Sequence, residues 1–451
     1  MNRFLLCAPG SGSGKTTVAC GILLALRNRG LRVASFKCGP DYIDPMFHAS
    51  VLGEPSRNLD PFFTEEETLR ALFCRAAADA DVSLIEGVMG YYDGIAATDR
   101  ASTYEVAAET ETPAVLVLPV RGMGLSAAAM AQGYCRFREK SRIAAILLNR
   151  AAPSIYGEMK EQIEAACGVP VCGYLPENPG LTLQSRHLGL LLPGEVTQLQ
   201  DRLAALAAQV ERTVDLDLLL RLASAAPPLR AALPTLPKGE KVRIAVARDE
   251  AFCFYYADNL QLLEDLGAEL VSFSPLRDSA LPEGCAGLLL GGGYPELHGE
   301  ALAGNERMLD AVRSAIAAGM PTIAECGGFL YLHETMETAD GKTFPLCGVL
   351  PGRCWDTGKL RRFGYVSLEG RGPSVLGENA RLRGHEFHYF ESSCPGGDFR
   401  AVKPVRGTVW DCIHSEKNLL CGFPHLYFYS NPACASSFLS ACRSFSGEAA
   451  R

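Results

Sequence analysis

The sequence predicts an α/β protein with two domains, each built on a mainly parallel sheet. Short apolar runs alternate with helical stretches through the first half of the chain, a proline-rich segment interrupts this alternation at residues 225–241, and the alternation then starts again. Continuous apolar runs of this length are typical of parallel strands that are buried on both faces. The length of 451 residues is in the range of two or three domains.

Five runs in the first half are predicted strands, because each is too short for a helix and is bounded by Gly, Pro or charged residues. They are residues 4–8, 32–36, 82–85, 114–119 and 143–148. The Ala- and Leu-rich stretches 17–29 and 65–78 are predicted to be crossover helices. Strands that alternate with helices in this way predict a doubly wound parallel sheet.

The second half begins after a predicted linker. Residues 197–224 are expected to form one or two amphipathic helices, and residues 225–241 contain four prolines and no apolar periodicity. The runs 242–247, 270–273, 287–290 and 322–324 are again typical of strands. We therefore predict a first domain at 1–222, a linker at 223–241 and a second domain at 242–451.

The composition argues against several classes of protein. The net charge, 43 − 51 = −8, disfavours broad binding to nucleic acid or to an anionic membrane surface. The 17 cysteines include no Cys-x-x-Cys pair, so we expect reduced cysteines, no zinc site and a cytoplasmic location. The short apolar run at the N-terminus ends at glycines, which predicts neither a signal peptide nor a membrane span.

A glycine-rich loop that follows a predicted strand and opens a helix is a predicted nucleotide phosphate site. Its glycines let backbone N–H groups wrap around a phosphate, its lysine neutralises charge, and its first threonine can bind Mg²⁺. Pro9 stands where the strict pattern has glycine, and the alternative interpretation is a turn without a ligand. The residues concerned are Gly10, Gly12, Gly14, Lys15, Thr16 and Thr17.

Three acids and a lysine are expected beside this loop, at the carboxyl ends of strands, where ligands of open α/β sheets collect. Glu86 ends one predicted strand, Asp93 follows it, and Asp41 comes just after another. We predict Thr16, Asp41 and Glu86 as ligands of Mg²⁺, which prefers oxygen. Each acid alone could instead be a helix cap or a turn residue. Lys37 is a predicted clamp on a transferring phosphoryl group.

Cys326 is a predicted nucleophile in the second domain. It stands between a strand and a helix in Glu-Cys-Gly-Gly, where the glycines permit the sharp turn that exposes a nucleophile. The alternative is a cysteine of the core. The backbone N–H groups of Gly292 and Gly327 are predicted to stabilise an oxyanion. A histidine must act as base and acid, and the candidates are His385, His388 and His425.

An ATP site joined to a Cys–His site suggests an amidotransferase, and here a resemblance becomes specific. From residue 3 to about residue 440, an ordered set of motifs closely resembles the family of cobyrinic acid a,c-diamide synthases. The motifs are GSGSGKTT, FKCGPDYIDP, IEGVMGYYDG, SRHLGL, ARDEAFCFYYADNL, LLLGGGYPELH, ECGGFLYL and RGHEFHYFES.

The resemblance implies an N-terminal P-loop domain with a parallel sheet like that of dethiobiotin synthetase, and a C-terminal class I glutamine amidotransferase domain with a flavodoxin-like sheet. It implies that ATP phosphorylates the c and then the a acetate of a corrin, cobyrinic acid, and that ammonia from glutamine displaces the phosphate. We expect a monomer or a homodimer. The site residues implied are Asp41, Glu86 and Asp93 for the synthetase, Cys326 and His425 for the glutaminase, and Asn149 as a reader of adenine.

The chain departs from the family pattern near its histidine. Tyr427 stands where a second histidine is usual, and class I glutaminases often have Glu at that position, so the group that orients His425 is left open. Arg186-His187 and Arg361-Arg362 are candidate contacts to substrate carboxylates. The alternatives in function are the same reaction on nickel sirohydrochlorin or hydrogenobyrinic acid, a partition-type ATPase switch, or a catalytically inactive second domain.

Overall fold

The computed structural model describes residues 1–178, 180, 185–186, 189–190, 193–196 and 198–449. The chain divides into two compact units, Met1–Leu233 and Pro234–Arg451. The predicted boundaries, with a linker at 223–241, stay a prediction. Among the described residues, no helix is long and apolar enough to cross a membrane.

The first unit contains the parallel sheet that the sequence predicts. Within the described residues, seven strands lie in the order β3-β2-β4-β1-β5-β6-β7, and each neighbouring pair is parallel. All five predicted strands are confirmed, and two more flank them. The strands are β1 (Arg3–Cys7), β2 (Val33–Cys38), β3 (Arg57–Leu59), β4 (Val82–Glu86), β5 (Ala114–Pro119), β6 (Ile143–Asn149) and β7 (Val171–Leu175).

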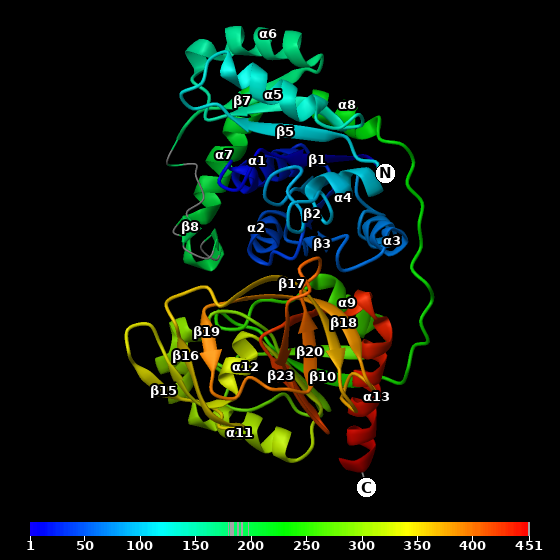
Figure 1. Ribbon diagram of the computed structural model, residues 1–451, viewed down its shortest axis with the longest axis vertical. Coiled ribbons are helices and arrows are strands. Elements are labelled where there is room, and N and C mark those ends of the chain that lie inside the picture. The colour runs from blue at the N-terminus through cyan, green and yellow to red at the C-terminus, as the bar shows by residue number, and fades with distance from the viewer. Residues whose placement is uncertain (179, 181–184, 187–188, 191–192, 197, 450–451) are drawn as a thin grey trace. The chain divides into compact units, whose positions relative to one another are not determined.

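Helices cover this sheet, and Figure 1 shows them with the strands between. The helices α1 and α7 approach closely at Gly21, where a Cβ atom would lie 2.9 Å from side-chain atoms of both Leu206 and Val210. The predicted helices at 17–29 and 65–78 are confirmed, and so is the prediction for 197–224 from residue 198 onward, since residue 197 lies outside the described residues. The helices are α1 (Lys15–Asn28), α2 (Ile43–Leu52), α3 (Glu66–Ala76), α4 (Thr103–Glu109), α5 (Ser126–Arg136), α6 (Tyr156–Cys167), α7 (Leu199–Thr213) and α8 (Leu216–Ser224).

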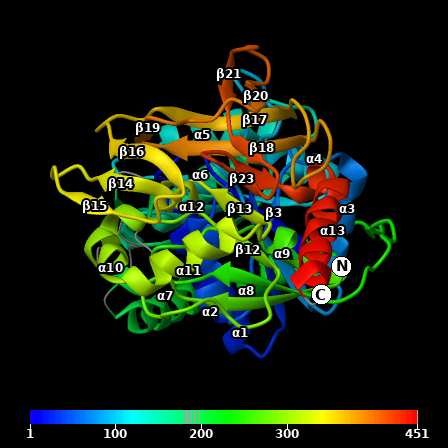
Figure 2. The same cartoon turned by 90° about the horizontal axis from the view of Figure 1, so that it is seen from below.

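The second unit contains a second sheet, in the order β11-β10-β12-β13-β23-β22. Its strands are parallel except for β22, and the four predicted runs are confirmed. Figure 2 shows α13 beside α9. The elements are β10 (Val242–Ala247), α9 (Ala257–Asp265), β11 (Ala268–Phe273), β12 (Gly287–Leu290), α10 (Gly299–Gly304), α11 (Glu306–Ala317), β13 (Thr322–Glu325), α12 (Gly327–Tyr331), β22 (His414–Glu416), β23 (Leu419–Gly422) and α13 (Pro432–Ala449).

Two smaller, mainly antiparallel sheets complete the second unit. One has the order β15-β14-β16-β19 and the other β21-β20-β17-β18-β24, and the second of these places His385 opposite His425. The strands are β14 (His333–Glu337), β15 (Thr343–Pro345), β16 (Leu350–Asp356), β17 (Arg362–Gly370), β18 (Arg381–His388), β19 (Phe390–Ser392), β20 (Phe399–Val402), β21 (Val409–Cys412) and β24 (His425–Tyr427).

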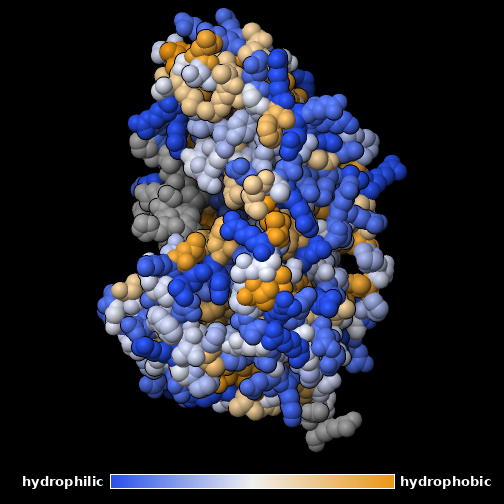
Figure 3. Space-filling view, in the orientation of Figure 1, coloured by the Kyte–Doolittle hydropathy of each residue, from blue (hydrophilic) through white to orange (hydrophobic). Residues whose placement is uncertain are grey.

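Each unit has its own apolar core. One core gathers side chains from β1, β2, β4, β5 and β6 with α3 and α5, and the other gathers side chains from β10, β12 and β13 with α11 and α12. The face drawn in Figure 3 is largely hydrophilic, with apolar residues in separate patches. The two candidate sites lie outside these cores, at the carboxyl ends of strands: Glu86 ends β4 and Glu325 ends β13, directly before Cys326.

Candidate active sites

The glycine-rich loop joins β1 to α1 in the form expected of a phosphate site. Gly12 and Gly14 have φ angles of 75° and 85°, a left-handed conformation that glycine adopts without strain. The ammonium group of Lys15 donates hydrogen bonds to the carbonyl oxygens of Gly10, at 3.1 Å, and Met89, at 2.6 Å. Burial, together with the charge of Lys37, lowers the pKa of Lys15 to about 8. Thr17 lies on the first turn of α1.

Asn149, at the end of β6, lies against this loop. Its Nδ2 donates to the carbonyl oxygen of Ser13 at 2.8 Å, and its Oδ1 accepts from the N–H of Arg150 at 3.0 Å. A Cβ atom on Gly14 would lie 2.5 Å from Nδ2, so the contact requires glycine there. These contacts give Asn149 a structural part in the loop, and its reading of adenine stays a prediction.

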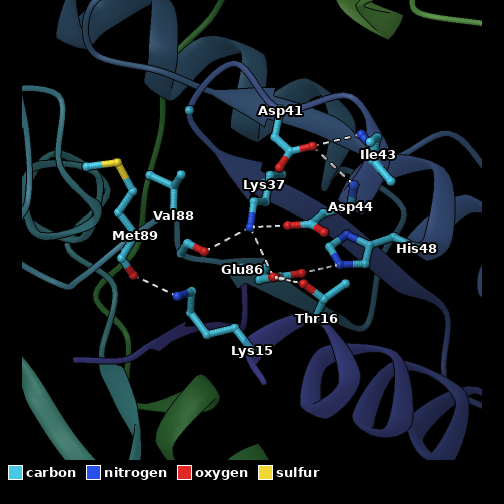
Figure 4. A network of polar contacts seen from close by, with 12 residues as sticks. Lys15, Thr16, Lys37, Asp41, Ile43, Asp44, His48, Glu86, Val88 and Met89 are labelled. Carbon is cyan, nitrogen blue, oxygen red and sulfur yellow. Dashed lines mark hydrogen bonds and ion pairs between the residues drawn. The ribbon is translucent and has the colours of Figure 1, made fainter. Parts of the chain in front are cut away.

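Glu86, at the end of β4, is the centre of a buried polar network (Figure 4). Its Oε1 accepts from the hydroxyl of Thr16 at 2.7 Å and from the ammonium of Lys37 at 3.0 Å. Its Oε2 accepts from Nε2 of His48 at 2.6 Å. Burial alone would raise the pKa of this carboxyl, but Lys37, His48 and Thr16 outweigh burial and lower it. Glu86 is therefore ionised in the folded chain.

The side chain of Lys37 is held in place by acidic side chains. Its Nζ is 2.6 Å from Asp44 Oδ2, and it also donates to the carbonyl oxygen of Gly87 at 2.9 Å. Burial would lower the pKa of Lys37, but Asp44 and Glu86 raise it, so the side chain is a cation. Its role as a phosphoryl clamp stays a prediction. Asp41 precedes α2, and its Oδ1 accepts from the N–H groups of Ile43 and Asp44, at 2.7 and 3.3 Å, in the first turn.

Asp93 makes its hydrogen bond within its own turn and not to the network around Glu86. Its Oδ2 accepts from the N–H of Gly90 at 3.0 Å, and the side chain is exposed. A Cβ atom on Gly90 would lie 2.7 Å from the carbonyl oxygen of Pro9, so this turn packs closely against the phosphate loop. Asp93 is thus near the loop through its own turn, and its catalytic part stays a prediction.

Two buried members of the network, Asp44 and His48, were missed by the sequence reasoning. Both lie on α2, four residues apart, and therefore on one face of the helix. Their spacing of four residues, in the segment that follows the predicted strand 32–36 and Lys37, is the signal that could have indicated them. Nδ1 of His48 lies 3.2 Å from the hydroxyl of Ser56, which itself donates to the carbonyl oxygen of Ser35 at 3.1 Å.

Cys326 forms a strained elbow between β13 and α12. Its φ of 47° and ψ of −100° are unusual for a residue with a side chain, and such strain is typical of functional sites. The elbow depends on close backbone contact, because a Cβ atom on Gly328 would lie 2.1 Å from the carbonyl oxygen of Leu290. The N–H of Gly328 donates to the carbonyl oxygen of Gly291 at 3.0 Å, which joins the two predicted glycine segments.

His425 is the histidine that interacts with Cys326. The ring is buried, and burial alone would lower its pKa, but Cys326 and Glu325 raise it to about 10. A Cβ atom on Gly292 would lie 2.4 Å from Cε1 of the ring, so Gly292 leaves room for it. A Cβ atom on Gly327 would lie 3.1 Å from the backbone nitrogen of Gly293. The oxyanion role of Gly292 and Gly327 stays a prediction.

The other two candidate histidines have different surroundings. His388 has its Nδ1 2.7 Å from the carbonyl oxygen of Phe390 and its ring stacked on Phe423, with centroids 3.8 Å apart. His385 is buried opposite His425, and burial lowers its pKa to about 3. Arg362 lies over Trp410, and Arg361 pairs with Glu391. Arg186 is described only as part of a short strand, and His187 lies outside the described residues.

Comparison with known proteins identifies both halves of the chain. A family model described as a CobQ/CobB/MinD/ParA nucleotide binding domain matches residues 4–191. A second, described as a CobB/CobQ-like glutamine amidotransferase domain, matches residues 243–433. The chain is therefore of the class that joins a nucleotide-binding domain to a glutamine amidotransferase domain.

The full-length relatives narrow this class to one family. Cobyrinate a,c-diamide synthases from Caldanaerobacter subterraneus subsp. tengcongensis, Priestia megaterium and Dehalococcoides mccartyi are 40%, 38% and 37% identical to it. The matches cover 98% of this chain in each case, and 98%, 97% and 98% of the relatives. The chain belongs to the cobyrinate a,c-diamide synthase family.

Proposed function

We propose that this chain uses ATP and glutamine to amidate the a and c acetate carboxylates of cobyrinic acid in cobalamin biosynthesis. The observation that carries the proposal is the strained Cys326, which interacts with the buried His425 in a chain that also has a glycine-rich loop between β1 and α1. A family relationship over nearly the whole chain supports the choice of substrate.

The glutaminase half supplies ammonia. His425 takes the proton of the Cys326 thiol, and the thiolate attacks the side-chain amide carbon of glutamine. The N–H groups of Gly292 and Gly327 stabilise the oxyanion that forms. His425 then gives its proton to the amide nitrogen, the C–N bond breaks, and ammonia leaves. Water hydrolyses the thioester to give glutamate and restores the thiol.

The synthetase half activates the acid. A carboxylate is a poor electrophile, so one of its oxygens attacks the γ-phosphorus of ATP, the bond to the bridging oxygen of ADP breaks, and an acyl phosphate forms. Ammonia attacks the acyl carbon, phosphate leaves with the bonding electrons, and the nitrogen loses a proton. Lys15 and the backbone N–H groups of the loop hold the phosphates, while Glu86 fixes Thr16 and Lys37 in place.

The residues beside the loop fit Mg²⁺. Asp41 and Asp44 stand near Lys37 with the ionised Glu86, and burial, followed by the charge of Asp41, raises the pKa of Asp44 to about 8. Among the described residues, no group of three or more His, Cys, Asp and Glu side chains could hold a metal by itself. Mg²⁺ at nucleotide sites takes few protein ligands and completes its shell with phosphate and water. Thr16, Asp41 and Glu86 would hold it, and it would neutralise charge on the transferring phosphoryl group.

The test is mass spectrometry of the products formed from candidate tetrapyrroles with ATP and glutamine. The expected result is two successive conversions of acid to amide on cobyrinic acid, accompanied by ADP and glutamate. Conversion of nickel sirohydrochlorin or hydrogenobyrinic acid in preference to cobyrinic acid would reassign the substrate. Failure to amidate any of these macrocycles, with either glutamine or ammonia, would refute the proposed reaction.

A further inference from the structure

The catalytic histidine of the glutaminase half lacks a carboxylate at the usual place in the sequence. A histidine that serves a nucleophile needs an acceptor for its second ring nitrogen, which fixes the tautomer and stabilises the imidazolium. Two residues after His425 stands Tyr427, whose hydroxyl donates to Asp258 Oδ2 at 3.3 Å. The chain must therefore supply the acceptor from elsewhere.

Glu325, the residue directly before the nucleophile, reaches His425 from the end of β13. Its Oε2 lies 3.6 Å from Nδ1 of His425. Its Oε1 accepts from the backbone N–H of Leu426 at 3.1 Å, which holds the carboxylate beside β24. The Glu325 side chain is 15% exposed and the His425 side chain 4%, so their attraction is only weakly screened by solvent.

The position of the ring agrees with this pairing. The Cε1 atom, which lies between the two ring nitrogens, faces the open space left by Gly292. With Nδ1 directed to Glu325, Nε2 is the nitrogen available to Cys326. Both Cys326 and Glu325 raise the pKa of His425, so the imidazolium form has a negative group on either side.

Three further titratable groups near His425 lie on β18, and none of them takes the place of Glu325. His385 shares a face with His425 across the strands, but burial lowers its pKa to about 3 and it stays neutral. His388 is also neutral, since burial lowers its pKa to about 4. Glu386 follows His385, so it points to the opposite face of β18. Glu386 interacts with Arg362, Lys403 and Trp410, and its attraction to His425 is smaller than each of these.

We propose that Glu325 is the positioning residue of the glutaminase site, holding Nδ1 of His425 so that Nε2 faces the thiol of Cys326. The inference rests on the proposed glutaminase activity and adds the acid that completes its Cys–His pair. Glu325 touches no substrate atom in this scheme. It acts through His425, by fixing the ring and by stabilising the charge that the ring acquires from Cys326.

Glu325→Gln tests the proposal, because it removes the charge and keeps the shape. We expect the glutaminase kcat to fall about 100-fold or more, since loss of the equivalent carboxylate in a Ser-His-Asp site costs about 10⁴ in kcat. The KM for glutamine should change little, and amidation with added ammonia should continue. Glu334→Gln is the matched control, because Glu334 also accepts a backbone N–H, that of Gly352 at 2.8 Å, but is exposed.

A second measurement follows the reactivity of the Cys326 thiol itself. The rate at which a glutamine-like chloroketone alkylates Cys326 is followed against pH in the wild type, Glu325→Gln and Glu325→Asp. We expect Glu325→Gln to label more slowly below about pH 8, with the difference closing at higher pH as hydroxide takes the thiol proton. Glu325→Asp, which keeps the charge, should retain part of the acidic labelling.

The outcomes separate this inference from the proposed function. A Glu325→Gln variant with wild-type glutaminase kcat and wild-type labelling profile would overturn the positioning role. Equal losses in Glu325→Gln, Glu325→Asp and the Glu334→Gln control would also overturn it, since they would indicate a structural effect. If wild-type Cys326 fails to label and the wild type releases no ammonia from glutamine, the proposed glutaminase itself is wrong.

Discussion

Glu86→Gln is expected to destabilise the first unit and to stop amidation with either nitrogen donor. The carboxylate is fully buried and accepts from Thr16, Lys37 and His48. Glutamine has one acceptor oxygen in place of two and no charge, so Lys37 loses a counterion. Breaking a buried ion pair in this way costs about 3–5 kcal/mol. For a unit of this size that is a fall in Tm of about 6–20 °C, at about 2–4 °C per kcal/mol.

The contribution of Glu86 to the stability of the fold should depend on pH in a definite direction. The pKa of Glu86 is lowered in the folded chain, so its interactions add stability above the unfolded pKa of about 4.3. This contribution is lost as the pH falls below that value towards the folded pKa. The difference in stability between the wild type and Glu86→Gln should therefore be largest near neutral pH and should shrink as the solution becomes acidic.

The assay is calorimetric melting of both proteins across this pH range, together with amidation measured with glutamine and with ammonia. Asp93→Asn is the stability control, because Asp93 is exposed and accepts a hydrogen bond from the N–H of Gly90 within its own turn. A fall in Tm no greater than that of Asp93→Asn, or a difference that does not change with pH, would refute the account of Glu86 as a buried, ionised hub.

Three further predictions concern single contacts. Cys326→Ala should abolish amidation with glutamine and leave amidation with ammonia, as measured by product formation from each donor; loss of both would contradict the division of labour. Gly292→Ala should lower the glutaminase kcat because its Cβ would lie 2.4 Å from the His425 ring, and unchanged glutamine hydrolysis would show that the ring can move at no cost. His48→Asn should lower the synthetase kcat with both nitrogen donors by loosening Glu86, and a lower rate with glutamine alone would contradict this role.

The parallel sheets could be predicted from the sequence because strands that are buried on both faces consist of continuous apolar runs. The run 114–119 and the runs 242–247 and 287–290 coincide with β5, β10 and β12. The short strands β3 and β7 were not predicted, since β3 is three residues long and the β7 segment contains Gly173. The strands β14–β22, which pair mainly in the antiparallel sense, were also not assigned. A strand with one exposed face carries only an alternating and weaker signal.

Site residues that belong to a contiguous sequence motif could be predicted. Site residues that are brought together only by the fold were missed. The phosphate loop and the cysteine elbow are contiguous in sequence, so glycine positions alone indicate them. The contact between Glu86 and His48 joins β4 to α2 across 38 residues. The contact between Glu325 and His425 joins β13 to β24 across 100 residues (425 − 325), and neither pair has a fixed spacing that a motif could record.

The strained backbone at Cys326 explains how two consecutive residues can serve one histidine. In a regular strand the side chains of residues 325 and 326 would point to opposite faces, so at most one of them could face the ring. The left-handed turn at Cys326, with φ of 47°, ends the alternation of β13 at that point. The carboxylate that closes the strand and the thiol that opens the helix can then both contact His425. The elbow thus places Cys326 and the acid before it beside the same ring. In the proposed glutaminase, Glu325 would then take the part of the acid that is usual two residues after the histidine.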